Sequence, residues 1–114
     1  MTTADGALPA NRTAAKLALT WVGTSWKMTK NRAEAVAYVN AVCAALAAKS
    51  APGVQPFVLP SATALAEVSA AARGDGPPGT GPLLVGAQNA HWEEQGPWTG
   101  ELAVSQVADA GARL

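Results

Sequence analysis

The chain alternates between short apolar segments and longer segments with helical periodicity. Three apolar runs, residues 17–24, 54–59 and 83–87, have the length and the Val and Leu content of β-strands. The first run is almost continuously apolar, which is typical of a strand that is covered on both faces. Pro56 removes one backbone donor from the second run. The pattern therefore predicts three strands with helices between them.

The segment after the first strand predicts a long helix. Asn31 and Glu34 stand three residues apart before an apolar series, which indicates a capping box with Asn31 as the N-cap. The helix is expected to reach about residue 48, and the Pro and Gly of residues 50–53 end it. Its predicted inner side chains are Val36, Val39, Cys43 and Leu46.

A second helix is expected after the second strand. It should begin at a cap formed by Ser61 or Thr63 and end at Gly74. Its predicted inner side chains are Leu65, Val68 and Ala72. Residues 75–81 are too rich in Gly and Pro to be anything but a loop. A weaker helix is predicted for residues 104–110.

Residues 112–114 look like the opening of a fourth strand, and Gly86 suggests a close approach of two backbones in the third. The resulting order, β-α-β-α-β-loop-α-(β), predicts an α/β fold with parallel strands and right-handed crossovers. In such folds, functional residues gather in the loops after the carboxyl ends of the strands. Those loops are residues 25–30, 60–63 and 88–100.

Length and charge restrict the class of protein. The chain has 114 residues, a formal net charge of zero, and 49% hydrophobic residues. This fits one small domain without the electrostatic footprint of a nucleic-acid or membrane-surface binder. No apolar stretch approaches the roughly 18 residues of a membrane span. Residues 1–16 lack a signal-peptide core and are expected to be a flexible tail. With a single cysteine, Cys43, these features predict a cytoplasmic location.

A lone cation follows the first strand. Within residues 21–28, an apolar run with small residues near its end leads into Lys27. One interpretation is that this ammonium group neutralises a phosphate or a developing oxyanion. The other is an ordinary solvated lysine at the end of a strand. The residues alone leave both interpretations open.

Three motifs occupy the predicted loops. They are Gly23-Thr-Ser-Trp-Lys-Met28, Val85-Gly-Ala-Gln-Asn89 and Gly96-Pro-Trp-Thr-Gly-Glu101. In their order and separations they resemble the triosephosphate isomerase family. The resemblance implies a partial (β/α)8 TIM barrel, made of about the first three βα units and the start of strand four. Residues 17–114 would then be the N-terminal part of a barrel that takes about 250 residues when complete.

The resemblance implies an intramolecular oxidoreductase, an aldose–ketose isomerase of small sugar phosphates that works through an enediolate. By match, Lys27 would be the catalytic cation and would bind the substrate. Ser25, which stands where most members have Asn, would bind the substrate as well. The family's catalytic His after strand four and Glu after strand six fall outside the 114 residues, so the chain is expected to be inactive alone. No cofactor and no metal are implied.

The resemblance also implies a homodimer of the full-length protein. In the family, the Thr of the third loop reaches the neighbouring active site and steadies the catalytic Lys. Thr99 would inherit this role, with Glu101 in the same interface loop. Trp92 and Trp98 would be apolar anchors of that loop, unless they cover the barrel's own top. His91 is interpreted as a surface or interface residue and not as a substitute for the catalytic His.

Three hypotheses stay open. The first is the amino-terminal part of a sugar-phosphate isomerase. The loop tryptophans and the Ser25 motif resemble a branch that uses four-carbon sugar phosphates such as L-erythrulose 1-phosphate. The second is a phosphate-binding half-barrel that pairs with another chain, and the third is a non-catalytic relic. In each, open sheet edges predict a marginally stable or aggregation-prone chain.

Overall fold

The computed structural model describes residues 19–49, 51–74 and 81–114. Its elements are β1 (Thr20–Ser25), α2 (Arg32–Ala48), β2 (Val54–Leu59), the 3-10 turn η1 (Ala62–Ala64), α3 (Leu65–Arg73), β3 (Leu84–Val85) and α4 (Val104–Asp109). The predicted tail, residues 1–16, and nearly all of the predicted loop 75–81 lie outside the described residues. The alternation of strands and helices predicted from the sequence is confirmed.

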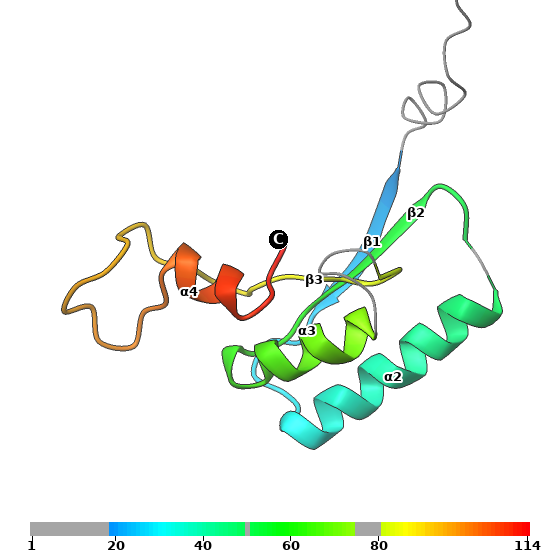
Figure 1. Ribbon diagram of the computed structural model, residues 1–114, viewed down its shortest axis with the longest axis horizontal. Helices are drawn as coiled ribbons and strands as arrows, with labels where there is room; N and C mark the ends of the chain where they lie inside the picture. Colours follow the sequence, from blue (N-terminus) through cyan, green and yellow to red (C-terminus); the bar gives the residue numbers. More distant parts are fainter. Residues whose placement is uncertain (1–18, 50, 75–80) are drawn as a thin grey trace, which may run out of the picture.

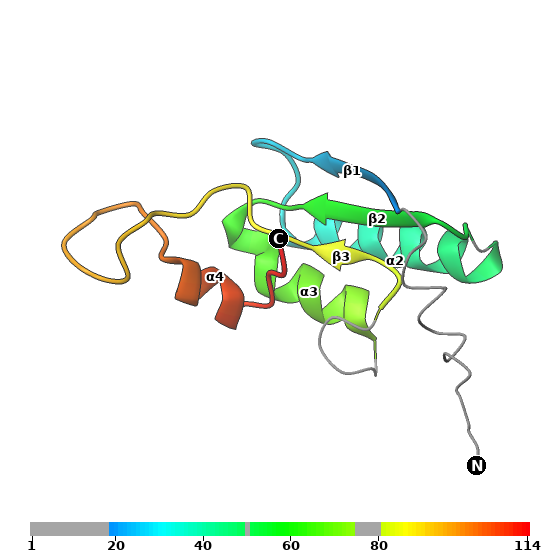
Figure 2. The ribbon, with the colours of Figure 1, turned by 90° about the horizontal axis from the view of Figure 1, so that it is seen from above.

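The three strands form one parallel sheet in the order β1-β2-β3. β1 pairs with β2 along its whole length, from Thr20 opposite Val54 to Ser25 opposite Leu59. Helices α2 and α3 contact each other and lie on the same face of the sheet (Figures 1 and 2). Parallel strands connected by helices on one face form the repeating unit of the (β/α)8 barrel. The described residues thus have the arrangement predicted for part of such a barrel.

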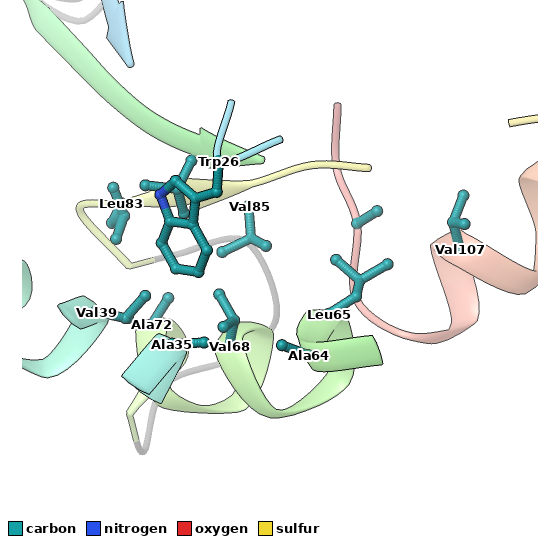
Figure 3. Packing of buried hydrophobic residues seen from close by; sticks show 12 residues of the cluster. Trp26, Ala35, Val39, Ala64, Leu65, Val68, Ala72, Leu83, Val85 and Val107 are labelled. Carbon is teal, nitrogen blue, oxygen red and sulfur yellow. The ribbon is translucent and has the colours of Figure 1, made fainter. Parts of the chain in front are cut away.

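The core fills the space between the sheet and the two helices (Figure 3). Val39 of α2 and Val68 of α3 are fully buried, and the indole of Trp26 enters the same space from the loop after β1. The whole buried cluster consists of Trp26, Ala35, Val39, Val58, Ala64, Leu65, Val68, Ala72, Leu83, Val85, Val107 and Ala112. The inner face predicted for the second helix is thereby confirmed, because all three of its residues belong to the cluster.

The predicted cap of α2 is confirmed. The Asn31 side chain accepts a hydrogen bond from the Glu34 backbone at 2.9 Å, and the Glu34 carboxylate accepts one from the Asn31 backbone at 3.0 Å. These two bonds satisfy backbone donors that have no partner within the helix. Because every atom involved lies within three residues, the sequence pattern alone specifies this cap.

The predicted cap of the second helix is wrong. The chain enters α3 through η1, and its N-cap Ser61 makes no side-chain cap hydrogen bond. The hydroxyl oxygens of Ser61 and Thr63 lie 3.2 Å apart and bond to each other. The Ala64 backbone instead donates to the Ser61 carbonyl at 3.0 Å, so the tighter turn satisfies the donor that a hydroxyl cap would have taken.

The prediction that the first strand is covered on both faces is also wrong. Residues 20–24 are all exposed, and Leu19, Trp21 and Val22 are each more than half exposed. In the described part of the chain β1 pairs on one side only, and it lies farther from the helices than β2 and β3 do (Figure 2). An apolar composition indicates that a strand can be buried. It does not show which other elements pack against the strand, and these determine whether it is buried.

The third strand is shorter than predicted, and the chain beyond α4 runs beside it (Figure 2). Arg113 donates its backbone N–H to the Val85 carbonyl at 2.8 Å, and Ala87 donates to the Leu114 carbonyl at 3.0 Å. A Cβ atom on Gly86 would lie 2.6 Å from the Cβ of Leu114, so the predicted close approach of backbones is present there. The end of the chain is thus attached to β3 by two backbone hydrogen bonds, but residues 112–114 form no strand, and the sheet of the described residues has three strands.

Among the described residues, none of the helices has the length and apolar content to cross a membrane.

Candidate functional site

A cavity of about 410 Å3 opens where the three strands end. Its walls come from the loops after β1, β2 and β3 and from α3 and α4, and they are mainly apolar. The lining residues are Lys27, Met28, Pro60, Ser61, Ala62, Leu65, Ala87, Gln88, Asn89, Leu102 and Val107. Its size is in the range of small-molecule sites, and Lys27 is the one cation among these lining residues.

The loop after β1 fixes the backbone around Lys27. Trp26 is 5% exposed, and its backbone N–H donates to the Leu59 carbonyl at 3.1 Å. Its carbonyl accepts the hydroxyl of Thr29 at 2.6 Å. Between these anchors Lys27 has a φ of 56°, in the left-handed region that residues other than glycine rarely occupy. The buried indole and the Thr29 hydroxyl therefore hold a turn that presents the Lys27 side chain at the rim.

Lys30, the second lysine of this loop, lies against aromatic rings and not at the cavity. The Nζ atom of Lys30 lies 4.9 Å from the centroid of the Trp26 ring and 5.1 Å from that of Tyr38. The two rings pack edge to face at 5.1 Å. This geometry allows cation–π attraction, which holds the Lys30 ammonium group over aromatic rings on the α2 side. Lys27, by contrast, is exposed and borders the cavity.

Gln88 connects the three loops, a contact that the sequence analysis did not predict. Its Nε2 atom donates to the carbonyl of Lys27 at 3.0 Å and to the carbonyl of Leu59 at 2.9 Å. The partners are 61 and 29 residues away in the sequence. Two local features mark Gln88: it follows β3 by three residues, and it belongs to the motif of residues 85–89.

Ser25, predicted to bind the substrate, is the last residue of β1 and is half-buried. It pairs with Leu59 and does not belong to the cavity lining. The structure thus brings Lys27 to the cavity and leaves Ser25 two residues behind it, at the end of the sheet.

The predicted interface loop forms an arm, which we define as residues 89–102, and it projects away from the sheet beyond α4 (Figure 1). Trp92 is 82% exposed and Trp98 is 47% exposed, while Thr99 and Glu101 are exposed as well. Both tryptophans are thus exposed in the described residues, and neither their role as interface anchors nor the alternative, that they cover the top of the barrel, is tested by this exposure. An assignment of the four residues to a subunit interface stays a prediction.

His91 was predicted to be a surface or interface residue, and of the two the surface position is wrong, because it is only 8% exposed. Its ring packs against both tryptophans, with centroid distances of 4.2 Å to Trp92 and 5.0 Å to Trp98. Its Nδ1 atom is 3.9 Å from a carboxylate oxygen of Glu101, and its backbone N–H donates to the Leu102 carbonyl at 2.8 Å. The histidine is thus an internal packing residue of the arm.

In the part of the chain that the structure describes, the titratable groups outside the cavity form no catalytic constellation. Burial raises the pKa of the Cys43 thiol, so it stays protonated at neutral pH, as expected of a packed small side chain. On the surface, the hydrogen bond from Arg32 lowers the pKa of Glu67. Within the described residues, no group of three His, Cys, Asp or Glu side chains is arranged to hold a metal ion.

Comparison with known proteins gives consistent matches. The family model of triosephosphate isomerase matches residues 20–114. An L-erythrulose-1-phosphate isomerase of Mycolicibacterium smegmatis is 50% identical over 94 residues, which cover 82% of this chain and 34% of the relative. One of Brucella abortus is 45% identical over 89 residues, which cover 78% of this chain and 32% of the relative.

A solved structure supports the same fold. The crystal structure of triosephosphate isomerase from Bartonella henselae superimposes with a TM-score of 0.67 at 24% identity. The match covers 81% of this chain and 34% of that one. The chain thus spans about a third of the length of the relatives that it matches.

Proposed function

The chain belongs to the triosephosphate isomerase family, and from this premise we propose that Lys27 is the catalytic cation of an aldose–ketose isomerase acting on a small sugar phosphate. The observation that carries the proposal is the position of Lys27. It is the one cation among the residues lining the cavity where the three strands end. In α/β barrels, the chemistry takes place at that end of the strands.

The proposed role of Lys27 is electrostatic. Moving a proton between neighbouring carbons of a ketose phosphate develops negative charge on the carbonyl oxygen, and the phosphate adds a permanent negative charge. A fixed ammonium group beside an apolar wall stabilises both, because the wall keeps solvent from screening the attraction. The turn held by Trp26 and Thr29 supplies this fixed position without reorganisation during the reaction.

We propose that the acid and the base of the reaction come from residues outside these 114. The cavity lining contains no His, Asp or Glu side chain, so Lys27 has no proton-transfer partner among its neighbours there. The 114-residue chain on its own should then show no turnover. Saturable isomerase activity from the purified chain would contradict this expectation.

For the substrate, we propose a four-carbon ketose phosphate in preference to a triose phosphate. The support is the printed activity of the relatives, L-erythrulose-1-phosphate isomerases that are 40–50% identical over most of this chain. The lining residues do not by themselves select a chain length, because the cavity of about 410 Å3 could hold either sugar.

We further propose that the arm of one copy docks near the cavity of a second copy in the complete protein. Two exposed tryptophans at the end of a projecting loop provide the apolar anchors that interfaces favour. Met28, which is 97% exposed at the rim of the cavity, offers an apolar acceptor surface. Thr99 would then approach the neighbouring Lys27.

A graft tests the catalytic role. In the graft, the aligned segment of this chain replaces its counterpart in the Mycolicibacterium smegmatis relative. We expect activity on L-erythrulose 1-phosphate above that on dihydroxyacetone phosphate. Lys27→Met should lower kcat/KM by about 10²–10³-fold, the usual effect of removing one group that stabilises transition-state charge. Lys49→Met, at the exposed C-cap of α2, is the control and should leave kcat/KM unchanged.

Two outcomes would count against the proposal. If Lys27→Met were as active as the unsubstituted graft, Lys27 would not be the catalytic cation. If the unsubstituted graft folded but turned over neither sugar, the phosphate-binding half-barrel would be favoured, and a chemical-shift change of the Lys27 amide on adding inorganic phosphate would support that alternative.

A further inference from the structure

One side-chain amide connects the loops that follow all three strands. Nε2 of Gln88, three residues after β3, donates to the Lys27 carbonyl at 3.0 Å and to the Leu59 carbonyl at 2.9 Å. The Leu59 carbonyl ends β2 and also accepts the backbone N–H of Trp26. Through Gln88, the peptide of Lys27 is therefore attached to the ends of both other strands.

Lys27 needs an external support of this kind. Its φ of 56° lies in the left-handed region, where the Cβ atom of an L-residue crowds the following carbonyl. Glycine would adopt the conformation freely, but glycine has no ammonium group. Conformations of this type persist only where surrounding contacts fix them. The hydrogen bond from Gln88 fixes the orientation of the Lys27 carbonyl from outside the loop.

A primary amide suits this position. It carries two N–H donors, and Nε2 of Gln88 faces two carbonyl oxygens. The opposite orientation of the amide would place its oxygen against both carbonyls, so the two acceptors themselves determine which end faces them. A carboxylate or a thioether of similar length offers no donor and could not replace it.

We propose that Gln88 is a positioning residue for Lys27: its amide holds the left-handed turn and thereby sets where the ammonium group meets the substrate. The inference deepens the proposed function and rests on it, since the position of Lys27 matters to rate only if Lys27 acts on the substrate. Gln88 itself need not touch the substrate, although it lines the same cavity.

Two substitutions in the graft test the inference. Gln88→Met removes the donors with little change in length, and Gln88→Glu replaces them by an acceptor that faces two carbonyls. In crystal structures of the variants, we expect Lys27 to leave the left-handed region and its Nζ atom to move. Displacement of a catalytic group by about 1 Å can cost about 10²-fold in rate, so kcat/KM should fall to that extent, with KM raised and kcat lowered together.

The matched control is Gln55→Glu. Within the described residues, the amide of Gln55 donates to the neighbouring Pro56 carbonyl alone, at 3.0 Å, near the amino end of β2. The same chemical change at that site should leave the φ of Lys27, KM and kcat as they are. If Gln88→Glu fails to fold, Gln88→Met decides the test.

Two results would overturn the inference. One is a Lys27 φ that stays near 56° in the Gln88 variants. The other is a lower thermal midpoint with unchanged KM and kcat per folded site, which would make Gln88 a structural residue only. A failure of the proposed function can be told apart from a failure of this inference. The first would leave Lys27→Met as active as the unsubstituted graft. The second is read from the φ of Lys27 in the Gln88 variants, which needs no activity measurement.

Discussion

At the scale of single residues, the burial of Cys43 predicts a pH effect. Partial burial raises the pKa of its thiol, and the side chain packs against the core. A raised pKa means that the folded state keeps the proton longer than the unfolded state does. The stabilisation is thus complete below the ordinary thiol pKa of about 8.5 and is lost as pH rises from there through the raised value.

Thermal midpoints measured from pH 7 to pH 10 would test this. The unsubstituted chain should lose stability more steeply above about pH 8.5 than Cys43→Ala does, because the variant has no thiol to ionise in the unfolded state. Parallel curves for the two proteins would show that burial of the thiol contributes nothing to the pH dependence.

Lys27 and Gln88 show what the sequence could tell about the site and what it could not. The place of Lys27 at the cavity was predictable because Lys27 follows β1 by two residues and belongs to a motif that resembles the triosephosphate isomerase family. The contacts of Gln88 were not predictable, although it also belongs to one of the quoted motifs, because its two partners lie 61 and 29 residues away and are backbone carbonyls, which every residue has. Hydrogen bonds between a side chain and distant backbone leave no mark on local sequence.

At the scale of elements, the capping box of α2 gives a prediction with a control inside the same helix. Asn31→Ala removes the acceptor for the Glu34 backbone and should cost about 1 kcal/mol of unfolding free energy. Asn40→Ala, at an exposed position in the middle of α2, should raise the free energy of unfolding instead, because alanine is the better helix former. Urea titrations of both variants measure the difference, and equal effects would argue against the cap.

The arm gives a second prediction at this scale. Among the described residues, the buried Nε2 atom of His91 has no hydrogen-bond partner, so the imidazole packs against Trp92 and Trp98 at the cost of an unsatisfied polar atom. His91→Leu should therefore preserve the conformation of the arm and cost little stability. His91→Ala should loosen the arm, because the two indoles lose the side chain against which they pack.

Tryptophan fluorescence distinguishes these outcomes. Trp98 is 47% exposed in the unsubstituted arm. A looser arm would expose it further, so the emission should shift to longer wavelength in His91→Ala but not in His91→Leu. A shift of the same size in both variants would mean that the imidazole holds the arm through a specific polar contact.

The elements also differ in how far local sequence determined them. α2 and β2 agree closely with prediction, because a capping box and a turn-bounded apolar run are local features. The start of α3 was wrong, since the competition between a hydroxyl cap and η1 depends on how Ala64 and Leu65 pack in the core. The prediction that β1 is covered on both faces was wrong because the burial of a strand depends on which other elements pack against it, and the strand's own sequence does not specify them.

At the scale of the whole molecule, the exposed side of β1 governs the behaviour of the chain in isolation. Within the described residues β1 has one neighbouring strand, so its other edge presents free backbone donors and acceptors. Leu19, Trp21 and Val22 lie along that strand and are each more than half exposed. An apolar, unpaired edge is a template for pairing with another chain, so the isolated 114-residue chain should associate as its concentration rises.

A charge on this edge should suppress the association without destabilising the fold. Val22 is 55% exposed, so Val22→Lys places an ammonium group in solvent beside the free edge, where like charges on two chains repel. Val104→Lys is the control, because Val104 is 62% exposed on α4, away from the sheet edge. In sedimentation velocity experiments over a range of concentrations, Val22→Lys should remain small while Val104→Lys associates like the unsubstituted chain. An unsubstituted chain that stays a monodisperse monomer at every concentration would contradict the argument, because its apolar edge would then need no partner.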